Sequence, residues 1–351
     1  MARIEDVARL ARVSPATVSR ALSQPALLRT GTLARVEAAI AQLSYVPHAA
    51  ARTLASNRSR MIGALLPTLD HTSFALTAQG LQTALADRGY TLVLACHGYD
   101  LEAETRLARE LVARGVDGLF FVGLQRSRAL SELLRRTQTP YVVGWNADVP
   151  RGTWSVGFDN RAASALVVDH LVGLGHRRIA LVAGLRATND RARARAEGVL
   201  ARLAAHGIAI PPAWLRECPY SIEAGAVAAA SILDARERPT ALVGGNDAIA
   251  IGMLKHAREA GIDVPGRLSV AGFDDQEIAG LVTPGLTTVR FPAQAIGERA
   301  AEALVARIEA RPHPRQVVLG IDLVVRLSTG PVPTCAPAGR RASASTAAVR
   351  R

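Results

Sequence analysis

The chain has 351 residues, of which 49% are hydrophobic and 4% aromatic, and it carries a formal net charge of +12. This length predicts roughly two or three compact units. No uncharged apolar run reaches the length of about 18 residues that a membrane-spanning helix needs, and Glu5 and Asp6 lie where a secretory signal would be apolar. We therefore expect a cytoplasmic protein with no membrane partner.

The residue pattern gives no indication of catalysis or of a bound metal. Cys96, Cys218 and Cys335 lie far apart and are odd in number, which favours reduced thiols over disulfides or a metal site. Nucleophile-elbow, metalloprotease and phosphate-loop motifs are missing from the sequence. The adjacent acids Asp274 and Asp275 should point apart on a strand-to-helix turn. We expect no catalytic residue, no cofactor and no metal.

The positive charge is concentrated at the two ends of the chain. Residues 1–60 contain nine arginines against three acids, a balance of +6, and residues 331–351 contain four arginines and no acid. The residues between them carry only about +2. A basic block joined to a nearly neutral body is typical of a nucleic-acid-binding domain attached to a ligand-binding domain.

Residues 1–47 predict a small all-α unit. Apolar residues recur at helical spacing over Ile4–Ala11, and Ser14-Pro15 provides an N-cap and a first-turn proline for a second helix. Two short helices joined by a tight turn can place the second helix in the major groove of DNA. The residues that this helix should present to DNA are Pro15, Ala16, Thr17, Ser19 and Arg20.

These side chains suit different parts of the double helix. Arg20 can donate two hydrogen bonds to guanine, whereas the hydroxyls of Thr17 and Ser19 suit phosphate oxygens. A pair of helices alone is weak evidence, because such corners also occur as plain packing.

From Met61 onward the pattern changes to alternating strands and helices. Apolar runs predict buried parallel strands at Ile62–Leu66, Thr91–Ala95, Gly118–Val122, Tyr141–Gly144, Ile179–Ala183, Ala241–Gly244 and Leu268–Gly272. Intervening helices are expected at Phe74–Arg88, Glu102–Arg114, Arg161–Leu174, Ala194–His206, Glu223–Ala235 and Ala248–Ala260. About ten strands over this length predict two doubly wound α/β lobes, with ligands at the carboxyl ends of the strands.

Several strings in the sequence are similar to one known family. IEDVARLARVSPATVSRAL resembles the headpiece of the lactose-repressor (LacI/GalR) family, and SYVPHAAARTLASNRSRMIGALLP resembles its hinge and core entry. Family-like strings continue at LGHRRIALVAG, GGNDAIAIG, VAGFDD and LTTVRFPAQAIGERA. Arg12 stands where Gly is common in the family, so a left-handed backbone there should cost on the order of 1 kcal/mol.

The resemblance implies an α/β protein with an N-terminal all-α helix-turn-helix headpiece and a two-lobed, periplasmic-binding-protein-like core of doubly wound parallel sheets. The expected units are the headpiece at 1–47, a hinge helix and linker at 48–60, the effector-binding and dimerisation core at 61–329, and a disordered basic tail at 330–351.

The expected hinge is rich in alanine and too short to be a stable isolated helix, so it should fold only when dimer and DNA are both present. By resemblance, Leu54 is the apolar wedge that enters the minor groove; packing against the core is the alternative. Arg52 and Arg58 would lie near phosphates or be solvated.

The resemblance also assigns an effector pocket. Arg195 and Asp274 would be its donor and acceptor, and Phe74 and Tyr220 would stack on the ligand or wall it off. Asn246 follows the strand Ala241–Gly244 and is placed with them. The alternatives are a helix N-cap for Asp274 and a structural salt bridge for Arg195, which opens an R-x-x-G step into a helix. Asp247 is interpreted as a cap.

We therefore expect a repressor that binds double-stranded, pseudo-palindromic operator DNA as a homodimer, under allosteric control by a small sugar. The strings HGYD and VGFDN are similar to the gluconate-repressor branch, which favours a sugar acid. Whether the effector releases the protein from DNA or promotes binding stays open. A sugar-binding receptor without a DNA role is the alternative, and an α/β enzyme is a third possibility.

Overall fold

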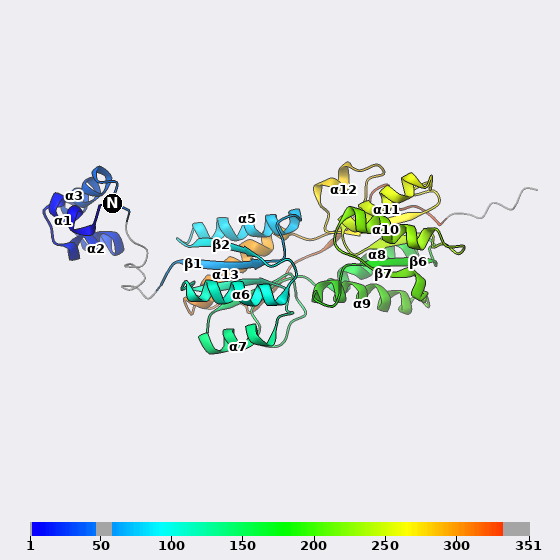
Figure 1. Ribbon diagram of the computed structural model, residues 1–351, viewed down its shortest axis with the longest axis horizontal. Coiled ribbons are helices and arrows are strands. Elements are labelled where there is room, and N and C mark those ends of the chain that lie inside the picture. The colour runs from blue at the N-terminus through cyan, green and yellow to red at the C-terminus, as the bar shows by residue number, and fades with distance from the viewer. Residues whose placement is uncertain (1, 47–57, 333–351) are drawn as a thin grey trace, which may run out of the picture.

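The computed structural model describes residues 2–46 and 58–332, which form an all-helical headpiece and a two-lobed α/β core (Figure 1). Residues 48–57 of the expected hinge and linker, with Arg52 and Leu54, and the tail beyond Val332 lie outside the described residues. Arg58 lies within them and donates to the carbonyl of Ile308 in the core at 3.4 Å.

The headpiece consists of α1 (Ile4–Ala11), α2 (Pro15–Ser23), the 3-10 turn η1 (Pro25–Leu27) and α3 (Thr30–Gln42). Its core forms around the fully buried side chains of Val7, Val18 and Val36, one from each helix. Ser14 caps α2, because its Oγ accepts a hydrogen bond from the backbone N–H of Thr17 at 3.2 Å. Arg12 ends α1 with φ 54°, which confirms the predicted left-handed turn.

The N-terminal lobe is a six-stranded sheet in the order β11-β5-β4-β3-β1-β2. Its elements are β1 (Met61–Leu66), α5 (Thr72–Ala86), β2 (Thr91–Cys96), α6 (Leu101–Ala113), β3 (Gly118–Val122), α7 (Arg128–Thr137), β4 (Tyr141–Gly144), β5 (Ser155–Gly157), α13 (Ala293–Ile308) and β11 (Gln316–Val318). The last two come from the end of the core sequence, so both lobes contain distant parts of the chain.

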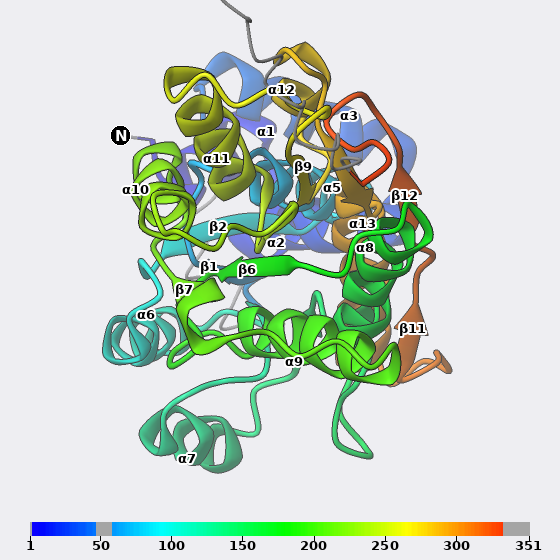
Figure 2. The same cartoon turned by 90° about the vertical axis from the view of Figure 1, so that its right-hand side faces the viewer.

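The C-terminal lobe is a second six-stranded sheet in the order β12-β10-β9-β8-β6-β7. Its elements are α8 (Asn160–Gly173), β6 (Ile179–Ala183), α9 (Asp190–Ala205), the 3-10 turn η2 (Pro212–Trp214), β7 (Leu215–Glu217), α10 (Ile222–Leu233), β8 (Ala241–Gly244), α11 (Asp247–Glu259), β9 (Ser269–Phe273), α12 (Glu277–Leu281), β10 (Thr287–Arg290) and β12 (Asp322–Val324). Figure 2 shows α8 and α9 on one face of this sheet and α10 and α11 on the other.

The prediction of two doubly wound lobes is confirmed, with differences at the edges. The described residues form twelve strands rather than about ten, and β12 pairs with β10 in antiparallel orientation. Helix α9 begins at Asp190 instead of Ala194, so Arg195 lies in its second turn and does not open the helix. Hydrogen bonds tie Gly330 and Val332 to the core, whose packing therefore extends past residue 329.

Helices α5 and α13 of the N-terminal lobe pack unusually closely. A Cβ atom added at Gly297 would collide with the backbone carbonyl oxygen of Thr77, and the Thr77 hydroxyl donates to the carbonyl of Ala293 at 3.0 Å. Because a backbone atom cannot move aside as a side chain can, this contact requires glycine.

We predict that Gly297→Ala lowers the free energy of unfolding by about 1–3 kcal/mol, because the extra methyl group forces the two helices apart. Urea denaturation of the purified protein measures this loss. The control is Gly173→Ala at the end of α8, where an added Cβ meets nothing within 4 Å. Equal stability of the two variants would show that the helices separate without cost.

Candidate DNA-binding face and effector cleft

Helix α2 presents the predicted DNA-binding residues at the headpiece surface. Pro15, Ala16, Ser19 and Arg20 are exposed, whereas Val18 between them is fully buried against the other helices. Thr17 is half-buried, and its hydroxyl lies 2.9 Å from that of Ser14. The exposed face of α2 is therefore held rigidly by its apolar opposite face.

A cleft between the two lobes gathers the predicted effector residues. All five of them line one cavity of about 20 Å³: Phe74, Arg195, Tyr220, Asn246 and Asp274. The N-terminal lobe adds His71, Ser73, Tyr99 and Trp145, and the C-terminal lobe adds Asn189 and Arg191. A cavity of this size holds about one water molecule, so a sugar needs the side chains or the lobes to move apart.

Arg195 and Asp274 contact each other directly. Their side chains are each 8% exposed, and Arg195 Nη1 lies 3.3 Å from Asp274 Oδ1. Burial raises the pKa of Asp274, although the neighbouring Arg195 opposes this effect. The suggested salt bridge of Arg195 is thus present in the cleft itself, and it joins the predicted donor to the predicted acceptor.

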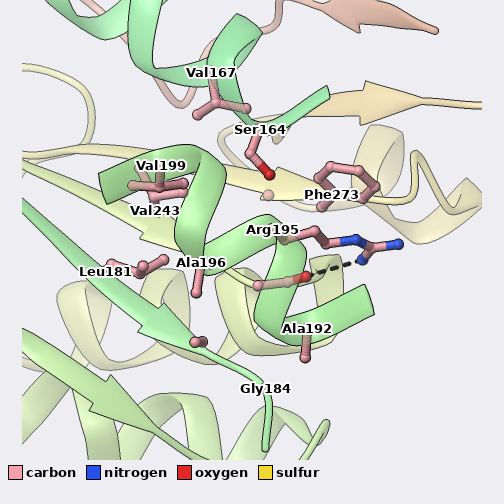
Figure 3. A pocket seen from close by; sticks show the side chains of 14 residues that line it. Ser164, Val167, Leu181, Gly184, Ala192, Arg195, Ala196, Val199, Val243 and Phe273 are labelled. Atoms are coloured by element: carbon pink, nitrogen blue, oxygen red, sulfur yellow. Dashed lines mark hydrogen bonds between the residues drawn. The ribbon is translucent and has the colours of Figure 1, made fainter. Parts of the chain in front are cut away.

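Three further contacts fix the Arg195 guanidinium. Its Nε donates to Asn160 Oδ1 at 3.0 Å and its Nη1 to the carbonyl of Gly245 at 3.1 Å, while its Cζ lies 3.6 Å from the ring centroid of Phe273. Figure 3 shows the guanidinium pointing away from the apolar side chains of Leu181 and Val199, which line a cavity of about 10 Å³ beneath α9. The charged end is therefore directed into the cleft.

The polar residues that follow β8 and β9 do not have the helix-capping roles suggested for Asp247 and Asp274. Asn246 caps α11 by accepting from the N–H of Ile249 at 2.9 Å, so the interpretation of Asp247 as the cap is wrong. Asp247 is fully buried and accepts from the Thr288 hydroxyl at 2.5 Å. Asp274 is no helix cap either, because α12 begins after Gln276.

Asp274 and Asp275 point apart, as predicted. Asp274 adopts φ 119°, a strained conformation for a residue with a side chain, and faces Arg195 in the cleft. The carboxylate of Asp275 instead pairs with Arg290 and Arg326, each at 2.6 Å.

Aromatic side chains from both lobes meet in the cleft. The ring centroid of Tyr220 lies 5.8 Å from that of Tyr99 and 6.0 Å from that of His71, and Phe74 lies 4.6 Å from Trp145. Sequence reasoning identified Phe74 and Tyr220 but missed the other three, which follow strand ends or open a helix in the N-terminal lobe.

The first residues of α9, a helix of the C-terminal lobe, contact the N-terminal lobe. Asp190 Oδ2 accepts from the backbone N–H of Leu124 and from Asn146 Nδ2, both at 2.9 Å. Arg191, only 5% exposed, donates from Nη1 to the carbonyl of Val122 at 2.9 Å. Arg191 is thus a second cleft arginine, which the predicted start of α9 at Ala194 concealed.

Comparison with known proteins identifies the family. A model described as "Bacterial regulatory proteins, lacI family" matches residues 3–48, and one described as "Periplasmic binding protein-like domain" matches residues 168–329. The HTH-type transcriptional repressor PurR of Aliivibrio fischeri is 33% identical over 321 residues, which cover 90% of this chain and 95% of that protein. The chain belongs to the LacI family of transcriptional repressors.

Other relatives agree with this assignment. The ribose operon repressor of Escherichia coli is 33% identical over 309 residues, covering 88% of this chain and 93% of that protein. The structure of the lac repressor dimer bound to operator and the anti-inducer ONPF matches with a TM-score of 0.84 and 28% identity, covering 94% of this chain and 99% of that chain.

This LacI-family chain is thus a DNA-binding transcriptional repressor, and its relatives are repressors rather than enzymes. They give no support to the alternative of a sugar receptor without a DNA role. Within residues 2–46 and 58–332, none of the helices combines the length and the apolar character needed to cross a membrane.

The N-terminal lobe contains two buried ionisable side chains that lie next to each other. The side chains of His97 and Glu104 are 5% and 3% exposed, and His97 Nε2 lies 3.8 Å from Glu104 Oε1. Burial raises the pKa of Glu104 to about 7. Burial, together with the nearby charge of Arg191, lowers the pKa of His97 to about 4. Glu104 therefore titrates close to neutral pH.

We predict that Glu104→Gln becomes increasingly more stable than the wild type as pH rises from about 4.5 to above 7. The folded wild type retains a proton on Glu104 that the unfolded chain releases near the ordinary pKa of 4.5. That stabilising contribution is complete below pH 4.5 and is lost as pH rises through the folded pKa, a change of about 3 kcal/mol.

Urea denaturation at pH 5 and pH 8 measures the difference between the two proteins. The lowered pKa of His97 acts in the opposite direction, since its contribution is present above pH 6.5 and lost toward pH 4, but both proteins retain it. Glu102→Gln, an exposed position on the same helix, is the control. A pH-independent difference for Glu104→Gln would contradict the prediction.

Proposed function

We propose that this repressor acts in the cytoplasm as a homodimer on a pseudo-palindromic operator, under the control of a small sugar acid bound between its lobes. The observation that carries the proposal is the interlobe cleft, where Arg195 and Asp274 oppose each other among aromatic side chains. A homodimer places two headpieces on two half-sites, which matches the symmetry of such an operator.

On DNA, α2 would lie in the major groove with Arg20 donating to guanine, while Thr17 and Ser19 contact phosphates and Pro15 and Ala16 allow close approach. The exposure of this face supports the assignment. For the hinge, we propose that Leu54 inserts into the minor groove and that Arg52 lies near phosphates.

In the cleft, a sugar acid would offer a carboxylate to Arg195 and hydroxyl donors to Asp274. The second cleft arginine, Arg191, is already paired with Asp190 at 3.1 Å, so Arg195 is the arginine that we propose to receive the carboxylate. Phe74 and Tyr220 would cover the apolar faces of the ring, and Asn246 would contribute a polar amide at the end of β8.

Effector binding would change the operator affinity through the spacing of the lobes. A ligand inserted between Arg195 and Asp274 favours one lobe arrangement, and the N-terminal lobes carry the hinges. A coupling of about 1–3 kcal/mol, usual for allosteric proteins, corresponds to roughly a 5- to 150-fold change in affinity.

The DNA-binding role of α2 is tested with Arg20→Ala. The loss of a bidentate contact to guanine should cost about 1–3 kcal/mol of binding free energy and relax the preference at one base pair of each half-site. Fluorescence anisotropy on an operator recovered by in vitro selection, and on its single-base variants, measures both effects.

Arg20→Lys is the matched variant, because it keeps the charge and loses the two-pronged donor. It should also lose the base preference. A uniform weakening on all sequences, with the preference unchanged, would show that Arg20 contacts phosphate only.

The effector role of the cleft is tested with Asp274→Asn. This variant should bind the operator with near wild-type affinity in the absence of effector and no longer respond to it, because an acceptor for the sugar hydroxyls is lost. A thermal-shift screen of sugars and sugar acids first identifies the effector, and operator titration with and without it measures the response. Loss of operator binding by a folded variant would place Asp274 in the dimer architecture instead.

A further inference from the structure

A second cavity of about 260 Å³ lies in the C-terminal lobe, away from the effector cleft. Four of its lining residues are arginines, and none of its lining residues is acidic. We call this cavity the arginine pocket, after Arg178, Arg236, Arg238 and Arg267.

The fold brings these four arginines together from distant parts of the sequence. Arg178 immediately precedes β6, Arg267 lies two residues before β9, and the other two lie in the loop between α10 and β8. Because β8 pairs in parallel with both β6 and β9, the amino ends of these strands meet at one edge of the sheet. The effector cleft lies at the opposite, carboxyl edge, about 13 Å away along a strand of four residues.

Acidic residues lie close to the pocket arginines in the sequence, at Asp234, Glu237 and Asp263, but do not line the pocket. In the part of the chain that the structure describes, none of the four guanidinium groups forms an ion pair, although other arginines of this lobe do, such as Arg202 with Asp169 at 2.6 Å. Within the described ranges, these four side chains make one hydrogen bond, from Arg238 Nε to the backbone carbonyl of Ala235 at 3.4 Å. Several positive charges around a concave surface reinforce one another and attract anions.

The floor of the pocket is rigid and largely apolar. Leu233 and Leu268, 2% and 1% exposed, belong to a packed base, and the four arginines around it are exposed to solvent. Beside them, the Thr240 hydroxyl is bonded to the buried ring of His176 at 2.9 Å. The polar contacts available to a ligand therefore come from the arginines.

The chemistry of guanidinium defines the class of ligand. Each group offers a planar fork of N–H donors that matches two oxygens of a phosphate. Four such groups exceed what one phosphate can satisfy, and the volume is below the roughly 300–1,000 Å³ of common ligand pockets. We propose that the arginine pocket binds a compact anion with two or more phosphoryl groups, independently of the effector cleft.

The test uses the full chain titrated with inorganic pyrophosphate in an isothermal calorimeter. The double variant Arg236→Ser/Arg267→Ser should weaken binding on the order of 10- to 100-fold, because charge-assisted hydrogen bonds are lost. The matched control is Arg106→Ser/Arg109→Ser, which removes the same charge from exposed positions of α6. It should change the affinity by less than about twofold, since these two arginines do not line the pocket and act on its ligand only through screened long-range charge.

The basic headpiece and tail are common to all three proteins, so the difference between the two variants reports on the pocket alone. A parallel titration with adenosine diphosphate distinguishes the source of the phosphoryl groups. Tighter binding than pyrophosphate indicates a nucleotide, and equal or weaker binding indicates a free anion. Equal weakening in both variants, or an unchanged affinity in the pocket variant, would overturn the proposal.

Discussion

The contact between the amino end of α9 and the N-terminal lobe holds the cleft in its observed geometry. Asp190 is hydrogen bonded to Leu124 and Asn146 across the lobe boundary, and Arg191 donates to the carbonyl of Val122. Burial raises the pKa of Asp190, but Arg191 and these bonds outweigh it and hold that pKa below its usual value. Asp190 and Arg191 also pair with each other at 3.1 Å, so separating the lobes would remove the hydrogen bonds to the N-terminal lobe but not this ion pair.

The close approach of Arg191 depends on Gly123. This residue has φ 89°, and a Cβ atom there would collide with the Arg191 guanidinium. Glycine adopts this backbone conformation without strain and leaves room for the arginine. The same helix carries Arg195 one turn later, so a side chain that contacts the N-terminal lobe and a side chain that lines the cleft share one rigid element.

The central strands could be predicted from the sequence to the residue. Gly118–Val122, Tyr141–Gly144, Ile179–Ala183 and Ala241–Gly244 are covered on both faces, which demands continuous apolar runs. Three of the edge strands, β7, β11 and β12, could not be predicted in this way, because they have three residues each and are partly exposed. In β10, the buried Thr288 is polar, and its hydroxyl is satisfied by Asp247 from another element.

The candidate site was predictable where residues follow strand ends or match family strings. Arg195 and Asp274 were found in this way. Trp145 and Tyr99 also lie beyond strand ends, those of β4 and β2, but they were missed because only the facing of the two lobes brings them to the site. Local preference could not decide between Asn246 and Asp247 as the cap of α11, since both side chains can serve. The Asp247 side chain is instead buried against Thr288, which leaves Asn246 as the cap. This contact joins residues that lie far apart in the sequence, so local preference could not reveal it.

The Arg195–Asp274 pair also restricts the chemistry of the effector. Breaking a buried ion pair by separating its partners costs about 3–5 kcal/mol unless each charge finds a new partner. A purely apolar ligand would leave Asp274 unpaired, and a ligand with only donors would leave Arg195 with the neutral acceptors of Asn160 and Gly245 in place of a carboxylate. The proposed effector must therefore bring an acceptor and a donor to opposite sides of the cleft, as a sugar acid does. Its carboxylate would pair with Arg195 and its hydroxyl groups with Asp274, so that the ligand bridges the two side chains that now pair with each other. Helix α9, which carries both Arg195 and Arg191, would transmit the resulting displacement of Arg195 to the N-terminal lobe.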